Sequence, residues 1–316
     1  FKKAWNAELS DEAGLTVVEI MNAAAEGDIK GLYIMGENPM LSDPDLNHVR
    51  EGLENLDFLV VQDIFLTETA ELADVVFPAT SFAEKDGTFT NTERRVQRVR
   101  KAVNAPGEAR EDWRILCDLA GRMGYSMDYA DPSAIQDEIA AVTPIYGGIV
   151  YNRIEEVGLQ WPCPDQNHPG TKFLHGGKFS RGKGKFHPVE FLPPKEMPDD
   201  EYPFILTTGR MLQHWHTGTM TRRSEVLNDL VPTGSIELNP ADAEELGVTE
   251  GEMLKVSSRR GKIDVPAQVT QKVAPGTVFL TFHFKENPAN LLTIAALDPI
   301  AKIPEFKACA VKVEKN

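Results

Sequence analysis

Hydrogen-bond donors crowd into one stretch of the chain, residues 210–223, with the sequence Arg-Met-Leu-Gln-His-Trp-His-Thr-Gly-Thr-Met-Thr-Arg-Arg. A short apolar run at 204–206 precedes it and predicts a buried strand that ends in a turn at 207–209. Arginine presents a planar fork of donors, and a turn containing glycine lets backbone N–H groups approach phosphate. The stretch therefore favours a pocket for a large anion, with an ordinary polar surface loop as the alternative.

The charge balance makes this local cluster more informative. The chain has 316 residues, 41% hydrophobic and 26% charged, which is a globular composition with enough chain for two cores. Its 48 acidic and 33 basic side chains give a net charge of -15, which argues against nucleic-acid binding because the phosphate backbone would be repelled. Arginines at 210, 222 and 223 stand out against that acidic background.

No apolar run approaches the length of a membrane span, and no signal peptide is visible. These features favour a cytoplasmic location, with the periplasm as the alternative. The chain begins at Phe1 without a helix cap or strand signal, so we expect it to be part of a longer polypeptide.

Cysteine and histidine spacing argues against a metal site encoded by this chain. Cys117, Cys163 and Cys309 are far apart and form none of the spacings of an iron–sulfur cluster or structural zinc, so free thiols are expected. His214 and His216 form an HxH pair, but no acidic or cysteine partner lies nearby in the sequence. Hydrogen bonding to a ligand or to the backbone is therefore favoured over metal ligation.

The first part of the chain alternates helices and short apolar strands. Helices are predicted at 11–27, 43–55 and 67–72, and strands at 31–35, 58–62 and 74–78. This order indicates a parallel α/β sheet, in which ligands bind at the carboxyl ends of the strands. Glu37, Asn38 and Asp63 lie at such ends, where a carboxylate suits a ribose diol or the N–H groups of guanine. A helix cap or turn former is the alternative for each, and for Asn38 before Pro39 the two interpretations carry equal weight.

Less regular segments follow. The polar run 84–97 is either a ligand loop or a hairpin edge. Residues 111–123 predict an amphipathic helix with Trp113, Leu116, Leu119, Ala120 and Met123 on one face, and Asp112 in its first turn suits the helix dipole. Residues 144–203 are rich in Pro and Gly, which indicates a long ordered connection.

The last part of the chain predicts a compact β-barrel. Strands are expected at 234–240, 253–257, 262–270, 276–284 and 309–313, in addition to the strand before Gly209. One short helix, 240–247, is capped by Asn239 and stopped by Gly247.

A series of motifs resembles a known family. Gly36-Glu-Asn-Pro39, Val60-Val-Gln-Asp-Ile-Phe65, Ala73-Asp-Val-Val-Phe-Pro78, Gly87-Thr-Phe-Thr-Asn-Thr-Glu-Arg94 and Gly209-Arg210 resemble the C-terminal half of the molybdopterin oxidoreductases. Trp161-Pro-Cys-Pro164, His283-Phe284, Asn290-Leu-Leu-Thr293 and the run 299–307 are most similar to the catalytic (alpha) subunit of molybdenum- or tungsten-dependent formate dehydrogenase. Each motif alone is weak, but the series is collinear and covers nearly the whole chain.

The resemblance implies a fold and a domain organisation. Residues 1–145 would be part of a Rossmann-like parallel-sheet domain that binds molybdopterin guanine dinucleotide, and 146–200 an ordered connection. Residues 201–316 would form a double-psi β-barrel of the aspartate-decarboxylase type, which also binds the dinucleotide.

The resemblance also assigns cofactor-binding residues. The nucleotide end would be held in the first domain by Glu37, Asn38, Asp63, Thr67 and Asp112. Phosphates and pterin would be contacted from the barrel by Thr208, Gly209, Arg210, His214, Thr217 and Gly218. The cofactor wall would be completed by Phe282, Asn290, Glu305, Phe306 and Lys307. The chemistry of the residues themselves supports Asp63 and Arg210, and is silent on Asn290 and Lys307.

The family's catalytic groups are absent from this chain. Its cysteine-ligated [4Fe-4S] cluster, its Cys or selenocysteine metal ligand and its active-site arginine belong to the N-terminal half. The resemblance therefore implies a fragment that holds a bis-molybdopterin guanine dinucleotide with Mo or W, without catalytic or metal-ligating residues and inactive alone. Its partners would be the N-terminal half of the same subunit and iron–sulfur electron-transfer subunits, and the whole enzyme would interconvert formate and CO2.

Three alternatives remain open. The chain could act on another substrate within the same superfamily, or be a cofactor-free relative such as the iron–sulfur subunit of respiratory complex I. The donors kept at 208–218 argue against loss of the cofactor. A stand-alone nucleotide-binding module is the third, although such a module would be expected to start with Met and a closed sheet.

Overall fold

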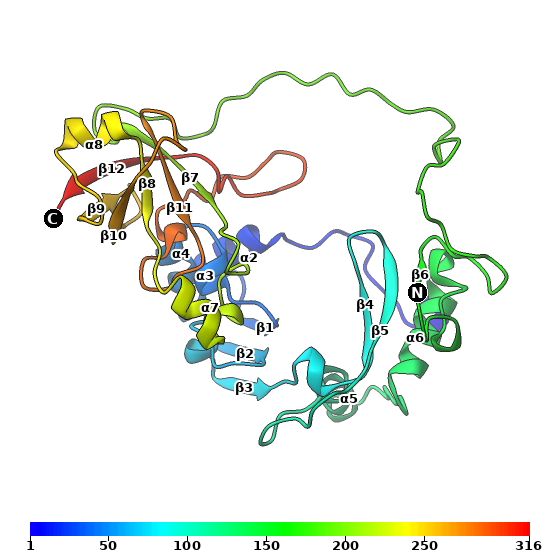
Figure 1. Cartoon of the computed structure of the whole chain (residues 1–316). Coiled ribbons are helices and arrows are strands. Elements are labelled where there is room, and N and C mark those ends of the chain that lie inside the picture. The colour runs from blue at the N-terminus through cyan, green and yellow to red at the C-terminus, as the bar shows by residue number, and fades with distance from the viewer. The chain divides into compact units, whose positions relative to one another are not determined.

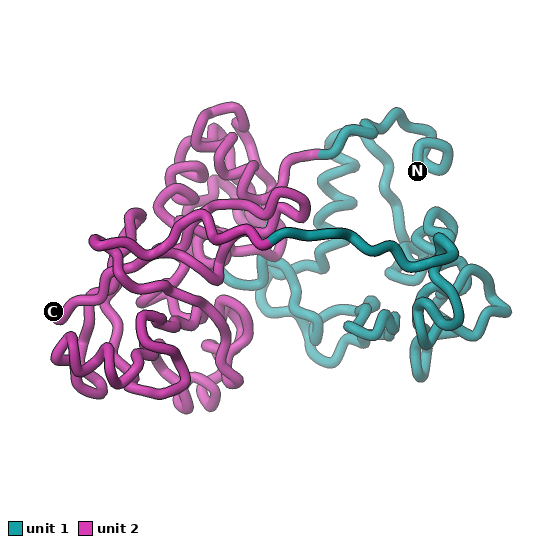
Figure 2. Tube along the Cα trace, turned by 90° about the horizontal axis from the view of Figure 1, so that it is seen from above, with its two compact units in different colours: residues 1–13, 62–65, 77–190 teal, residues 14–61, 66–76, 191–316 magenta.

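The computed structural model describes residues 1–316, and Figure 1 labels its helices and strands. The chain divides into two compact units, shown in different colours in Figure 2. One contains residues 1–13, 62–65 and 77–190, and the other contains 14–61, 66–76 and 191–316. None of the helices is both long and apolar enough to span a membrane.

Three strands form a sheet in the order β1-β2-β3, with β1 at Gly31–Met35, β2 at Phe58–Asp63 and β3 at Val75–Pro78. The amide of Asp74 donates to the carbonyl of Leu59 and that of Ala79 to Asp63. From the first of these hydrogen bonds to the second, the residue number increases in both strands. β2 and β3 are therefore parallel, as the alternation of helices and strands predicted.

The helices around this sheet are α2 (Val17–Ala25), α3 (Pro39–Ser42), α4 (Leu46–Glu54) and the 3-10 turn η1 (Ala70–Leu72). Of these, α2, α4 and η1 are shorter than the sequence predicted, and α3 was not predicted. α2 begins at Val17 rather than at residue 11, because Thr16 and Glu19 form a capping box at that point. Met21, Val49 and Leu59 join the helices and the sheet in one apolar core.

The predicted barrel is present and closed, with strand order β10-β8-β11-β7-β12-β9. Its strands are β7 (Phe204–Gly209), β8 (Ile236–Leu238), β9 (Met253–Ser257), β10 (Lys262–Val269), β11 (Thr277–Thr281) and β12 (Cys309–Lys315). The pairs β7–β11 and β8–β10 are parallel, and the other pairs are antiparallel. The interior is apolar, with Leu206, Ile236 and Leu254 fully buried.

Two local predictions for this region need correction. The turn expected at 207–209 is wrong, because Thr208 and Gly209 remain in β7 and pair with Leu280 and Thr281 of β11. Helix α7 (Glu225–Leu230) was not predicted. By contrast, α8 (Pro240–Leu246) is confirmed, and Asn239 caps it by accepting the amide of Ala241.

In the other unit, the polar run after residue 84 forms a hairpin. Its strands β4 (Gly87–Thr90) and β5 (Arg95–Val99) are joined by β6 (Leu159–Gln160) in the order β4-β5-β6. The helices are α1 (Lys2–Trp5), α5 (Asp112–Arg122) and α6 (Pro132–Val142), with 3-10 turns η2 (Phe82–Glu84), η3 (Pro144–Tyr146) and η4 (Tyr151–Arg153).

Helix α5 is confirmed, but its predicted apolar face is only partly covered in this unit. Its one buried residue, Ile115, lies outside the predicted face, and Met123 is 78% exposed. Helix α6 was missed, although Asp131 caps it and Pro132 occupies its first turn, which is a standard start signal.

Two arginines hold the irregular segment 146–172 in place. Arg94 donates to the carbonyls of Thr171 and Lys172 at 3.0–3.2 Å, and also to that of Trp161. Arg153 donates to Gly148 at 2.6 Å and to His168 at 2.7 Å. The guanidinium groups thus satisfy carbonyls that no helix or sheet would pair.

A buried carboxylate attaches the segment before β7 to the barrel. Glu196 is 8% exposed and accepts hydrogen bonds from Arg259 at 2.9 Å, from Arg260 at 2.6 Å and from the amide of Ala310 at 3.1 Å. Arg260 also donates to the carbonyl of Leu292. Burial opposes the charged form of Glu196, but Arg260 and Arg259 hold its pKa below the ordinary value.

We predict that Glu196→Gln destabilises the barrel by about 3 kcal/mol, because it leaves the largely buried guanidinium of Arg260 without a carboxylate, whereas the exposed Arg259 keeps its ion pair with Asp199. Urea unfolding monitored by circular dichroism gives the measurement. Because the folded-state pKa of Glu196 is lowered from 4.5, its contribution is complete above about pH 4.5 and is lost as the pH falls through the folded-state value. The exposed Glu201→Gln is the matched control, expected within about 0.5 kcal/mol of the native chain, and equal losses for both variants would contradict the assignment.

Candidate functional site

The site begins where β7 leaves the barrel. Thr208 and Gly209 are buried, and the Thr208 hydroxyl donates to the carbonyl of Phe306 at 2.6 Å. A Cβ on Gly209 would lie 2.6 Å from the ring of Phe279, so any larger residue would push this ring aside. The position of Arg210, the next residue, is therefore determined by packing on the barrel wall.

Arg210 and Lys307 are two positive charges without a carboxylate partner. The Lys307 ammonium donates to the carbonyl of Thr208, and the Arg210 guanidinium lies over the Phe282 ring, 5.1 Å from its centroid. Burial, and then the neighbouring Arg210, lower the pKa of Lys307. In a chain of net charge -15, a pair of mutually repelling cations with no counter-ion suits an anionic ligand.

His283 holds the loop that follows Arg210. Its ring is fully buried, Nε2 accepts from the amide of Met211 at 2.9 Å, and Nδ1 donates to the carbonyl of His216. Burial lowers the pKa of His283, and the nearby His214 and Arg210 act in the same direction against the hydrogen bond to His216. The imidazole is therefore neutral with its proton on Nδ1.

Gly218 closes the same loop. Its φ is +72°, and a Cβ there would lie 2.6 Å from the carbonyl oxygen of His283. Both the backbone conformation and the close approach require glycine. His214 is 4% exposed, and its ring nitrogens contact the Val231 carbonyl at 2.8 Å and the Thr221 hydroxyl at 3.3 Å. Both nitrogens are thus engaged with protein groups.

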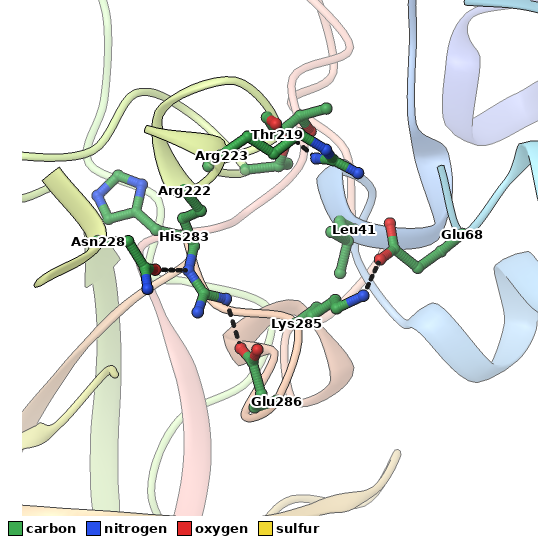
Figure 3. Close-up of a pocket in the computed structure, with 11 residues that line it drawn as sticks. Leu41, Glu68, Thr219, Arg222, Arg223, Asn228, His283, Lys285 and Glu286 are labelled. Carbon is green, nitrogen blue, oxygen red and sulfur yellow. Dashed lines mark hydrogen bonds and ion pairs between the residues drawn. The ribbon is translucent and has the colours of Figure 1, made fainter. Parts of the chain in front are cut away.

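A pocket of about 330 Å³ lies beside this loop (Figure 3). It is lined by Leu41, Glu68, Thr217, Gly218, Thr219, Arg222, Arg223, Asn228, His283, Lys285 and Glu286. Lys285 pairs with Glu68 at 3.2 Å and Arg222 with Glu286 at 2.5 Å. These two cations, unlike Arg210 and Lys307, are neutralised by carboxylates of the chain.

The predicted residues near the sheet have protein partners. Asn38 is buried, its oxygen accepts from the Thr69 hydroxyl at 2.7 Å, and its amide donates to Glu68 at 2.9 Å. The Thr67 hydroxyl accepts the amide of Ala70, and Glu37 is exposed. A structural role thus accounts for Asn38 and Thr67, and their assignment to the nucleotide stays a prediction.

Asp63 and Asp112 belong to the other unit. Asp63 ends β2, and its Oδ1 accepts the amides of Ile64 at 2.7 Å and Phe65 at 3.3 Å. Asp112 accepts from the Gln62 side chain at 2.8 Å and forms an ion pair with Lys85. Asp112 therefore has specific side-chain partners beyond the helix dipole that the sequence suggested.

The remaining predicted residues lie on the C-terminal part of the barrel unit. The Asn290 amide donates to the carbonyls of Leu41 and Ser42 at 2.9 and 3.2 Å, while its buried oxygen lacks a partner. Glu305 accepts the amide of Lys195 at 2.9 Å. Phe306 adjoins Lys307 and provides the carbonyl that Thr208 bonds.

Sequence reasoning missed two groups of this region. His283 is one, since a lone histidine between two phenylalanines gives no sign of the loop it holds. Asp43 is the other: burial raises its pKa to about 6, and its Oδ2 has no hydrogen-bond partner. It stands where a helix was expected to begin, so its sequence context suggested only a cap.

Comparison with known proteins accounts for both halves of the chain. The Molybdopterin oxidoreductase family matches residues 3–122, and the Molydopterin dinucleotide binding domain matches residues 204–310. The F420-dependent formate dehydrogenase subunit alpha of Methanocaldococcus jannaschii is 54% identical over 100% of this chain and 47% of that protein. Formate dehydrogenase H of Escherichia coli is 38% identical over 99% of this chain and 45% of that protein.

The chain thus spans about half the length of these relatives. Among solved structures, acetylene hydratase from Pelobacter acetylenicus has a TM-score of 0.73 at 19% identity, covering 94% of this chain and 46% of that one. At this identity the likeness shows a shared fold alone. On the two family matches and the relatives together, the chain belongs to the molybdopterin oxidoreductase family.

Proposed function

We propose that this chain is the cofactor-holding part of a formate dehydrogenase catalytic subunit and that it binds molybdopterin guanine dinucleotide. The observation that carries the proposal is the pair Arg210 and Lys307, two cations without a counter-ion at the end of β7. The dinucleotide is a polyanion with a diphosphate, which supplies the charge that this pair lacks.

The surrounding groups fit the same ligand. Arg210 offers a fork of donors, Lys307 a compact charge, and Phe282 an aromatic surface under the guanidinium. Gly218 permits a close backbone approach, and the buried Asn290 oxygen still lacks a donor. Thr208, Gly209, His214, Thr217, Glu305 and Phe306 would shape the wall around these contacts, and Glu37, Asn38, Asp63, Thr67 and Asp112 would serve the nucleotide end.

When bound, a bis-molybdopterin guanine dinucleotide with Mo or W supplies the two-electron chemistry that interconverts formate and CO2. The role of this chain would be to hold the cofactor in position. Arg210 and Lys307 would neutralise the phosphates, and His283 and Gly218 would hold the loop backbone in register. No residue of the chain is assigned a catalytic or metal-ligating role.

The fold is consistent with this role. The parallel pairs β7–β11 and β8–β10 within an otherwise antiparallel closed barrel support the double-psi assignment for residues 201–316. The sheet at β1–β3 supports a Rossmann-like domain within residues 1–145. Residues 146–200, which contain only short turns and β6, would then be the connection.

The relatives also suggest partners. Several are named as alpha subunits, which supports a complex with iron–sulfur electron-transfer subunits. The N-terminal half of the same subunit would carry the [4Fe-4S] cluster. Three relatives, 54%, 52% and 49% identical, are named F420-dependent, which favours F420 as the final electron acceptor.

We predict that Arg210→Ala in the full-length subunit lowers cofactor occupancy and formate oxidation together, by about tenfold or more, because a charge-assisted phosphate contact is lost. Metal analysis and a formate-dependent dye-reduction assay measure the two quantities on one sample. Arg50→Ala, on the exposed face of α4, is the control and should change neither. A fully loaded but inactive Arg210→Ala enzyme would show that the role is not cofactor binding.

We predict that Lys307→Met weakens cofactor binding while leaving the stability of the fold nearly unchanged. The apolar stem is kept and the charge repelled by Arg210 is removed, so stability of the cofactor-free protein should change by no more than about 1 kcal/mol. Cofactor retention should nevertheless fall, and Lys307→Arg should restore most of it. Thermal unfolding and cofactor release after gel filtration test this pair; a large loss of stability with normal retention would refute an anion-binding role for Lys307.

A further inference from the structure

His283 connects both ends of the loop that leaves β7. Its Nε2 accepts from Met211, the residue after Arg210, and its Nδ1 donates to the carbonyl of His216, two residues before Gly218. The ring is fully buried, and the carbonyl oxygen of His283 packs against Gly218. One imidazole thus links two points of the segment 211–218.

This arrangement works only for the neutral ring. Met211 approaches with an N–H group, which requires a lone pair on Nε2. A protonated imidazole carries N–H groups on both nitrogens, so the contact with Met211 would become donor against donor. The hydrogen bond to His216 would survive, because Nδ1 donates in both states.

The charges around the ring disfavour its protonation. Arg210, His214 and His216 face it from the loop, and no carboxylate contacts it. On the pocket side, the carboxylates Glu68 and Glu286 are engaged by Lys285 and Arg222, and Arg223 donates to the Thr219 carbonyl. Burial is the largest influence that lowers the pKa of His283.

We propose that His283 is a positioning residue for the cofactor-binding loop 210–218, and that protonation of its ring releases the Met211 end of this loop. The proposal rests on the proposed function, because it takes Arg210 and this loop to hold the dinucleotide. It adds an acid-sensitive element to that site: loop order is complete when the ring is neutral and is lost as the pH falls below the ordinary histidine value of 6.5 towards the lowered one.

A glutamine at position 283 distinguishes the effect of the two hydrogen bonds from the effect of protonation. His283→Gln presents an acceptor oxygen and a donor N–H, so it can bond both Met211 and His216, but it does not titrate. His283→Leu keeps the bulk and removes both hydrogen bonds. The matched control is His48→Gln, since His48 also bonds a neighbouring side chain, Asn22 at 2.9 Å, but lies on α4 away from the loop.

The test is hydrogen–deuterium exchange of the peptide 210–218 in the full-length protein between about pH 5 and pH 8, corrected for the intrinsic pH dependence of exchange. In the native protein and in His48→Gln, protection should fall by about tenfold across this range as one buried hydrogen bond is lost. His283→Gln should keep high protection throughout, and His283→Leu should show low protection throughout. Native-like acid loss of protection in His283→Gln, or native protection in His283→Leu, would overturn the proposal.

Cofactor content, measured on the same preparations, tests the proposed function separately from the role of His283 in the loop. If loop protection behaves as expected but the native protein binds no molybdopterin, the proposed function fails and the role of His283 in the loop stands. If the cofactor is bound and its retention is equal in the native, Gln and Leu proteins at all pH values, His283 does not position the cofactor loop and the inference fails.

Discussion

Two like charges without a counter-ion are the constraint around which the barrel unit is arranged. Arg210 directly follows β7 and Lys307 lies two residues before β12, and these two strands pair in the barrel wall. Lys307 donates to the carbonyl of Thr208 in β7. Such a pair is unfavourable without a ligand, because the cations repel each other and one is partly desolvated. The barrel holds it together because β7 and β12 are tied by backbone pairing and an apolar interior. Stability of the scaffold thereby keeps together two cations that an anionic ligand would neutralise.

The protonation state of His283 matters for the loop that begins at Arg210. His283 is buried next to apolar rings and near Arg210, so its neutral form is favoured and its two nitrogens take opposite hydrogen-bonding roles. The nearby pocket instead balances its charges internally, with Lys285 and Arg222 each held by a glutamate. Glu196 shows the same principle in the scaffold, where buried charge is tolerated because two arginines and an amide satisfy it.

The periodicity of apolar residues predicted most of the strands and the two sheet types, but not where each helix and strand begins and ends. The strand expected at 262–270 is present as β10, and the three apolar runs before residue 80 indicated the parallel sheet. Helix α2 was predicted too long because the capping box at Thr16 was overlooked, and α6 was missed despite its Asp131-Pro132 start. The turn expected at 207–209 failed because pairing with β11 outweighs the local preference of Thr and Gly.

The sequence by itself determined the class of the protein: its motif series and donor-rich stretch pointed to an anionic dinucleotide, and the family matches agree. The motif series carries this assignment, because residue types and their order along the chain can be compared without the fold, whereas the donor-rich stretch alone also fitted a polar surface loop. Only the tertiary structure decided which cations lack partners, since Lys307 meets Thr208 and His283 meets Met211 across long sequence separations. It also gave Asn38 and Asp112 protein partners far away in the sequence, which no spacing rule could reveal. Hydrogen bonding and burial depend on neighbours that only folding brings together.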